Sequence, residues 1–124
     1  YMLRQNTPNG PCLAAGLPWF SVAFGRDQCV VGLQTLPFMP DLSRDLIRVL
    51  AAYQGKKHDD ITEEDAGRIM HELRLGELAR CKEIAFTPYY GTVDATPLWL
   101  LLVSRYCRAT GDTDFAKSLW TNIE

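Results

Sequence analysis

The chain has 124 residues, of which 47% are hydrophobic and 23% are charged. This length and composition are typical of one globular domain. Its 13 basic residues are balanced by 15 acidic ones, so the sequence gives no reason to expect a surface for nucleic acid or for anionic membranes, which needs clustered Lys and Arg. The longest apolar run, residues 97–103, is far shorter than the roughly 20 residues that span a bilayer.

The four cysteines lie far apart in the sequence: Cys12, Cys29, Cys81 and Cys107. Single, widely spaced cysteines are typical of free thiols in a reducing compartment, which predicts a cytoplasmic protein. A zinc site is the alternative, but such sites normally present at least one close pair of ligands. His71-Glu72 resembles the start of a HExxH zinc motif, yet Leu75 stands where the second histidine is needed. We therefore expect no metal and no cofactor.

The N-terminal part of the chain predicts an irregular segment followed by two helices. Proline and glycine are frequent in residues 1–24, which favours extended, irregular chain. Residues 27–36 are compatible with a helix, and Pro37 follows as a helix-ending residue. The next helix has the clearest pattern, because apolar residues recur at helical spacing over residues 42–53 before the stop signal of Gly55.

Further helices are expected in the rest of the chain. Thr62 and Asp65 have the spacing of a capping box, which predicts a short helix over residues 62–73. Thr96-Pro97 reads as the N-cap and first residue of a third strong helix that ends at Gly111, and the aspartate after this glycine caps a last helix. Because no segment alternates with period two over a useful length, the sequence predicts an all-α fold of about four or five helices with long structured loops.

Two acidic residues mark the places where loops enter predicted helices. Asp27 lies in the first turn of one helix, next to Arg26, and Asp94 shortly precedes another. Five aromatic residues are found in the adjoining loops: Trp19, Phe20, Phe24, Tyr89 and Tyr90. Aromatic rings beside carboxylate and guanidinium groups suit a sugar, whose C–H faces pack on rings while its hydroxyls pair with charged acceptors and donors. The pattern therefore indicates a carbohydrate site shared by two loops.

Three blocks, in this order, carry a family resemblance: AGLPWFSVAFGRD from Ala15 to Asp27, HELRLGE from His71 to Glu77, and YYGTVDATPLWLLL from Tyr89 to Leu102. Together they resemble the bacterial amylo-alpha-1,6-glucosidase family, which is related to the glucosidase half of glycogen debranching enzyme and, more distantly, to the glucoamylases. The resemblance implies a glycoside hydrolase with an (α/α)6 barrel, also called an α/α toroid. Residues 1–124 would be a single segment, a partial barrel from the early part of that catalytic domain.

The resemblance also implies which residues bind the sugar. In the related glucoamylases an Arg-Asp pair before a barrel helix holds hydroxyls of the terminal glucose, and this role falls on Arg26 and Asp27. The aromatic residue before the pair corresponds to Trp19, which would form a wall of the pocket. The next two site loops of the family match three further residues: Glu72, Tyr90 and Asp94. The implied partner is an α-glucan or a small α-glucoside.

No catalytic residue is assigned within this chain. Inverting hydrolysis needs a general acid and a second carboxylate about 6.5 to 9.5 Å apart, and by resemblance both lie beyond Glu124. The residues also allow a plainer interpretation, in which Arg26-Asp27 is a surface ion pair and Asp27 complements a helix dipole. The alternative function is a non-catalytic, truncated helical fragment with at most weak carbohydrate binding. Because residues 98–103 are apolar all round, such a fragment would expose an apolar patch and self-associate.

Overall fold

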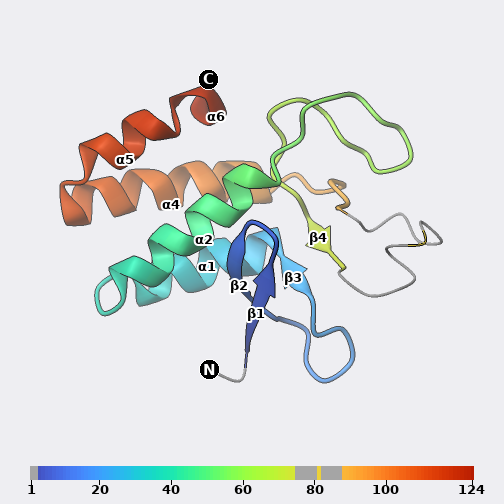
Figure 1. The fold of residues 1–124 in the computed structure, drawn as a ribbon, viewed down its shortest axis with the longest axis horizontal. Coiled ribbons are helices and arrows are strands. Elements are labelled where there is room, and N and C mark those ends of the chain that lie inside the picture. The colour runs from blue at the N-terminus through green and yellow to red at the C-terminus, as the bar shows by residue number, and fades with distance from the viewer. Residues whose placement is uncertain (1–2, 75–80, 82–87) are drawn as a thin grey trace.

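The computed structural model describes residues 3–74, 81 and 88–124. Within these residues the helices are α1 (Gly25–Thr35), α2 (Pro40–Ala52), α4 (Ala95–Thr110), α5 (Thr113–Ser118) and α6 (Trp120–Ile123). Short strands accompany them: β1 (Arg4–Thr7), β2 (Gly10–Leu13), β3 (Ala23–Phe24) and β4 (Glu72–Leu73). Figure 1 shows the helices grouped at one end of the molecule, with the strands and the longer loops toward the other.

The strands form two small antiparallel sheets. β1 pairs with β2 in a hairpin, from Arg4 opposite Leu13 to Thr7 opposite Gly10, and β3 pairs with β4. The expected all-α fold, a partial (α/α)6 barrel, is therefore wrong: the fold is mixed, and the described helices do not build a barrel. The strands are only two to four residues long, which is too short for an alternating pattern to be visible in the sequence.

Three of the predicted helices are confirmed as α1, α2 and α4. α2 begins at Pro40, because the fixed φ and missing N–H of proline suit a first helical position. α4 ends at Gly111, whose left-handed φ of 72° is open to glycine without steric cost. The residue at the N-cap of α4 is Asp94. Thr96 lies inside the first turn instead, and its hydroxyl accepts a hydrogen bond of 3.0 Å from the amide of Ile69.

The predicted helix over residues 62–73 is wrong, since this segment forms turns and then β4. The carboxylate of Asp59 accepts hydrogen bonds from the amides of Ile61 and Thr62, at 3.0 and 3.3 Å. Glu63 then has a φ of 53°, which lies outside the right-handed helical region. A side chain that captures nearby amides thus replaces the helix that the capping pattern predicted.

The C-terminal helix is capped as predicted, but it is not continuous. The carboxylate of Asp112 accepts a hydrogen bond of 3.0 Å from the amide of Phe115, as an N-cap residue does. The helix is then interrupted at Leu119, so that α5 and α6 are separate elements.

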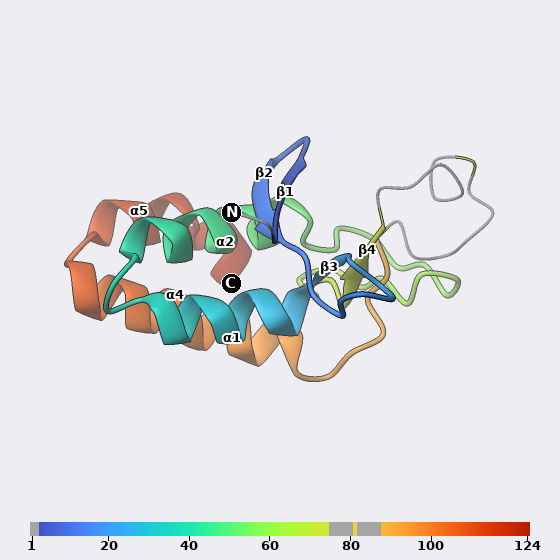
Figure 2. The ribbon, with the colours of Figure 1, turned by 90° about the horizontal axis from the view of Figure 1, so that it is seen from below.

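The core lies between α1, α2 and α4. Trp99 is fully buried, and its indole N–H donates to the carbonyl of Ile47 at 3.2 Å. A Cβ at Gly32 would lie 2.8 Å from the side chain of Leu102, so α1 and α4 pack closely there. Figure 2 shows α2 and α5 in one layer and α1 and α4 in the other. None of the described helices combines the length and the apolar character needed to cross a membrane.

The arrangement brings several loops to one end of the helices. α1 and α4 both begin at that end, and α2 ends there (Figure 1). The segments that precede α1 and α4 therefore share the loop end, where the candidate site residues lie.

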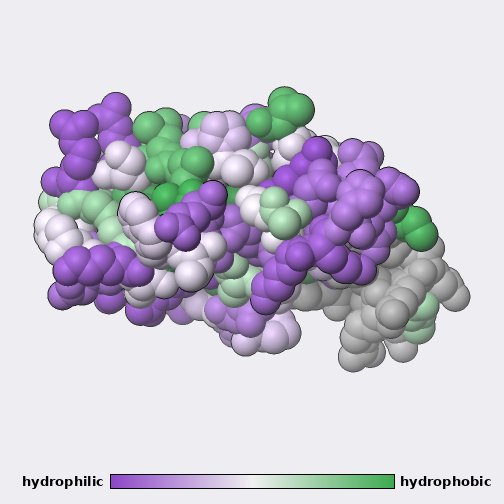
Figure 3. Space-filling model, turned by 90° about the horizontal axis from the view of Figure 1, so that it is seen from above, coloured by the Kyte–Doolittle hydropathy of each residue, from purple (hydrophilic) through white to green (hydrophobic). Residues whose placement is uncertain are grey.

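Some apolar side chains of the helices remain exposed. Leu100 and Leu101 of α4 are 40% and 42% exposed. Figure 3 shows apolar atoms on the helical half of the molecule beside a mostly hydrophilic loop half.

Candidate functional site

The loops that lead into α1 and α4 meet through a pair of charged side chains. Nη1 of Arg26, in the first turn of α1, lies 3.0 Å from Oδ2 of Asp94, at the N-cap of α4. These residues are 68 positions apart in the sequence. The other carboxylate oxygen of Asp94 accepts a hydrogen bond from the hydroxyl of Thr92. The structure thus brings together two of the six residues that the sequence singled out for sugar binding.

The first turn of α1 is held in place by residues 70–71, which directly precede β4. The amide of Gly25 donates to the carbonyl of His71 at 2.9 Å. A Cβ at Gly25 would lie only 1.9 Å from the carbonyl oxygen of Met70, so no side chain fits at this position. Glycine therefore lets the start of α1 approach residues 70–71 closely enough to direct Arg26 toward Asp94.

The pair remains open to solvent. The side chain of Arg26 is 53% exposed and that of Asp94 is 35% exposed, and an ion pair of this kind contributes about 0 to 1 kcal/mol to folding. The hydrogen bond from Thr92, followed by the interactions with Arg26, keeps the pKa of Asp94 below its ordinary value. At neutral pH Asp94 is therefore a carboxylate that accepts hydrogen bonds, not a proton donor.

Asp27 faces a different part of the surface from Arg26. It lines a pocket of about 320 Å³ together with apolar residues that include Leu3, Leu17 and Val31. Successive residues on a helix point in directions roughly 100° apart, so neighbours in the sequence do not share a face. Among the described residues, no hydrogen bond or ion pair joins Asp27 to Asp94. Arg26 and Asp27, which were expected to bind one sugar together, thus lie apart: Arg26 contacts Asp94, whereas Asp27 lines this apolar pocket.

Trp19 stands on a surface loop and is 87% exposed. It does not form the wall of an enclosed pocket in this structure. Its neighbour Phe20 is also exposed, at 57%. Phe20 contacts the ring of Phe24 edge to face, with centroids 6.3 Å apart.

Glu72 is buried within β4 and is only 5% exposed. Its carboxylate accepts a hydrogen bond of 2.6 Å from Nε of Arg74, and its backbone pairs with Phe24 and bridges to Tyr89. A buried carboxylate needs such a charged partner. The structure therefore places Glu72 in the sheet beneath the site, where its charge is compensated from within the chain.

Tyr90 is also an internal residue, with 3% exposure. Its hydroxyl donates to the carbonyl of Tyr53 at 2.8 Å, and burial raises the pKa of this hydroxyl. Its amide donates to the carbonyl of Thr62, also at 2.8 Å. These contacts make Tyr90 a residue that fixes residues 89–94, which we call the site loop, rather than one that reaches a ligand.

Other residues around the site loop were not among the six that the sequence singled out. The hydroxyl of Tyr89 donates to Oε1 of Glu63 at 2.7 Å, and the ring of His71 lies between the rings of Phe24 and Tyr89, with centroids 5.7 and 6.2 Å away. Within the described residues, Nδ1 of His71 is buried without a hydrogen-bond partner. The contact of Thr92 with Asp94 has a local signal, since a hydroxyl two residues before a carboxylate can bond to it. The contact with Glu63 has no such signal, because it spans 26 positions.

The described residues contain no group of three or more His, Cys, Asp or Glu side chains that could hold a metal ion. The cysteines are free thiols. In comparisons with known proteins, no family model matches the chain, and no curated protein matches it.

Proposed function

We propose that this chain binds the terminal glucose of an α-glucoside and is part of a glycoside hydrolase of the α-1,6-glucosidase type. The observation that carries the proposal is the contact between Arg26 and Asp94. The sequence interpretation required the loop before α1 and the loop before α4 to converge on one ligand, and these loops lie side by side at the same end of the helices.

The pair has the chemistry that a pyranose requires. A guanidinium carries five N–H donors and each carboxylate oxygen can accept two hydrogen bonds, so one contact between Arg26 and Asp94 leaves donors and acceptors for neighbouring hydroxyls. Charge-assisted hydrogen bonds of this kind are stronger than those between neutral groups. The exposure of both side chains means that a sugar reaches them without unfolding a loop.

The proposal assigns binding to this chain, and not the steps of catalysis. Inversion needs a general acid and a general base about 6.5 to 9.5 Å apart. The depressed pKa of Asp94 suits an acceptor for sugar hydroxyls and not a general acid at neutral pH. The acid and the base would therefore come from residues other than the six named here.

A second candidate is a non-catalytic protein of this mixed fold with at most weak carbohydrate binding. The burial of Glu72 and Tyr90 favours it, because two of the six expected contacts are then used inside the fold. Self-association through the exposed apolar side chains of α4 belongs to this candidate. Release of free glucose from isomaltose by the enzyme of which this chain is proposed to be a part, with binding of isomaltose to the chain measured in parallel, distinguishes the two.

Calorimetric titration with isomaltose tests the binding proposal. We expect Asp94→Asn and Arg26→Met each to weaken binding about tenfold, since each removes one or two charge-assisted hydrogen bonds. Arg105→Met is the matched control, because Arg105 is an exposed arginine farther along α4 and its loss should leave the affinity unchanged. Cellobiose, with a β-linkage, is the ligand control. A parent chain that binds neither isomaltose nor maltose would overturn the proposal.

A further inference from the structure

Residues 56–68, which we call the clamp loop, hold the site loop at two adjacent positions. The carbonyl of Thr62 accepts the amide of Tyr90 at 2.8 Å, and the carboxylate of Glu63 accepts the hydroxyl of Tyr89 at 2.7 Å. A Cβ at Gly91 would lie 2.2 Å from the Tyr89 hydroxyl and 2.9 Å from Oε2 of Glu63, so the absence of a side chain at Gly91 leaves room for the contact between the two loops. The conformation of the site loop therefore depends on that of residues 62–63.

The clamp loop is closed on itself by backbone and carboxylate contacts. Asp59 and Glu64 exchange two backbone hydrogen bonds of 3.0 Å, and the carboxylate of Glu64 accepts the amide of Lys56 at 2.8 Å. One further contact across the loop involves a histidine, the side chain that ordinarily changes protonation near neutral pH.

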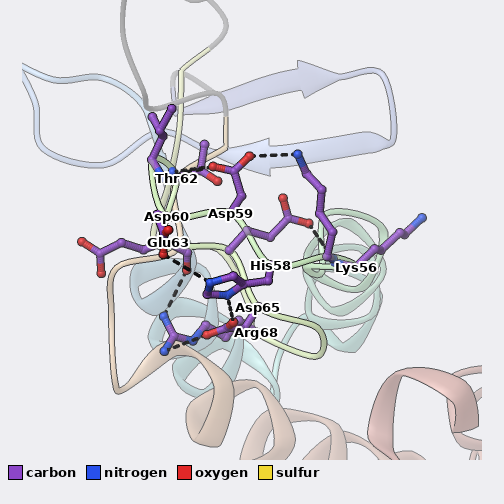
Figure 4. A network of polar contacts seen from close by, with 11 residues as sticks. Lys56, His58, Asp59, Asp60, Thr62, Glu63, Asp65 and Arg68 are labelled. Atoms are coloured by element: carbon purple, nitrogen blue, oxygen red, sulfur yellow. Dashed lines mark hydrogen bonds and ion pairs between the residues drawn. The ribbon is translucent and has the colours of Figure 1, made fainter.

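His58 bridges two carboxylates that lie on either side of residues 62–63. Its Nδ1 is 2.7 Å from Oδ1 of Asp65, and its Nε2 is 3.2 Å from Oδ1 of Asp60 (Figure 4). Ionised carboxylates only accept hydrogen bonds, whereas a neutral imidazole has one donor and one acceptor nitrogen. Both contacts are therefore satisfied together only when His58 is the doubly protonated imidazolium. A neutral ring would set a lone pair against one of the two carboxylates.

Two other pairs of opposite charges lie in the clamp loop. Lys57 pairs with Asp59 at 2.9 Å, and Arg68 pairs with Asp65 at 3.2 Å and donates to the carbonyl of Glu63 at 3.0 Å. The charged or titratable groups around His58 in this loop are Lys56, Lys57, Asp59, Asp60, Glu63, Glu64, Asp65 and Arg68. More of them are negative than positive, which favours the imidazolium. The hydrogen bond to Asp65 above all, and then the charge of Asp60, raises the pKa of His58 above its ordinary value.

We propose that protonation of His58 tightens the clamp loop and thereby holds the site loop, so that carbohydrate binding at Arg26 and Asp94 depends on pH. The second half of this inference rests on the proposed function, whereas the first half concerns the fold alone. A group whose pKa is higher in the folded than in the unfolded chain stabilises the fold fully below its unfolded pKa, about 6.5 for histidine. That stabilisation is lost as the pH rises through the folded pKa of His58. The clamp is thus held more firmly in mildly acidic solution than on the alkaline side.

Amide hydrogen exchange in the chain, followed by NMR between about pH 6 and about pH 8, tests the closure of the clamp. We expect the protection of the Tyr90 and Glu64 amides, corrected for intrinsic exchange, to fall several-fold over this range. In His58→Gln it should be low and independent of pH. In Lys57→Met, the matched control that removes a neighbouring charge but neither imidazole contact, the fall should remain. Asp60→Asn together with Asp65→Asn should lower the pKa of His58 seen in its ring resonances.

Equal protection of these amides at both ends of the range in the parent, or an unchanged pH dependence in His58→Gln, would overturn the inference. Titration with isomaltose at the same pH values separates its two halves. If exchange follows His58 while no sugar binds at any pH, the proposed function fails and the clamp stands. If sugar binds with the same affinity throughout while exchange changes, the link between the clamp and the site is refuted.

Discussion

Replacement of Gln28 tests how the N-terminal hairpin is attached to α1. Gln28 is 1% exposed, and its amide forms two hydrogen bonds with one residue of β2: Oε1 accepts the amide of Leu13 at 2.9 Å, and Nε2 donates to the carbonyl of Leu13 at 2.6 Å. The side chain therefore pairs with the hairpin as a neighbouring strand would. Methionine has a similar length but offers neither a strong donor nor a strong acceptor.

The structure gives the size of the effect. Gln28→Met leaves the N–H and the C=O of Leu13 without partners, and each unsatisfied buried backbone group costs about 1 to 3 kcal/mol. Leu13 is half-buried, so water recovers part of this, and we expect a loss of about 2 to 4 kcal/mol in the free energy of unfolding. In a urea titration followed by circular dichroism, this corresponds to a midpoint that is lower by about 1 to 2 M.

Gln34→Met is the matched control, because Gln34 lies on the same helix but is exposed. Its free energy of unfolding should stay within about 0.5 kcal/mol of the parent value. If Gln28→Met is as stable as this control, the two hydrogen bonds do not attach the hairpin, and the reasoning is wrong.

Three further predictions concern α1, α5 and the thiols. Gly25→Ala should destabilise the chain by several kcal/mol in the same urea assay, because its Cβ would lie 1.9 Å from the Met70 carbonyl oxygen; a stability equal to that of the parent would contradict the close approach. Asp112→Ala should cost about 1 kcal/mol through the lost N-cap of α5, and Asp112→Asn should recover most of it. Burial, as the main cause, raises the pKa of Cys29 to about 12, whereas Cys81 is exposed, so mass spectrometry after iodoacetamide treatment should find Cys81 alkylated and Cys29 unmodified. Rapid alkylation of Cys29 in the folded chain would refute its burial.

The helices that the sequence predicted correctly have strong local signals. α2 combines a proline at its first position with one apolar face, and α4 combines an apolar run with a glycine at its end. Such features act within a few residues of one another, so they are readable without knowledge of the fold.

The strands and the clamp loop depend on contacts that local patterns do not contain. β3 and β4 exist because Phe24 pairs with Glu72 across 48 positions of the sequence. Thr62 and Asp65 have the spacing of a capping box, yet the carboxylate of Asp59 takes the amides that a helix would need. Tertiary contacts and side-chain competition for backbone amides thus outweighed the helical signal.

The candidate site was likewise predicted only in part. The convergence of the loops before α1 and α4 was expected, and the contact of Arg26 with Asp94 agrees with it. The family pattern aligned Tyr90 and Glu72 with sugar contacts, but their hydroxyl and carboxylate bond to Tyr53 and Arg74 inside the fold. A residue type at a matching position does not show where its side chain points, because that direction is decided by packing.

A double-mutant cycle on isomaltose affinity tests the central claim, that Arg26 and Asp94 hold one sugar together. The cycle compares the parent with Arg26→Met, Asp94→Asn and the double variant, each measured by calorimetry at about pH 6, where His58 is protonated. We predict that each single change weakens binding about tenfold relative to the parent. The double variant should weaken binding, also relative to the parent, by a factor clearly smaller than the product of the two single effects, because the residues act as a unit. Single variants that bind isomaltose as tightly as the parent would contradict the claim.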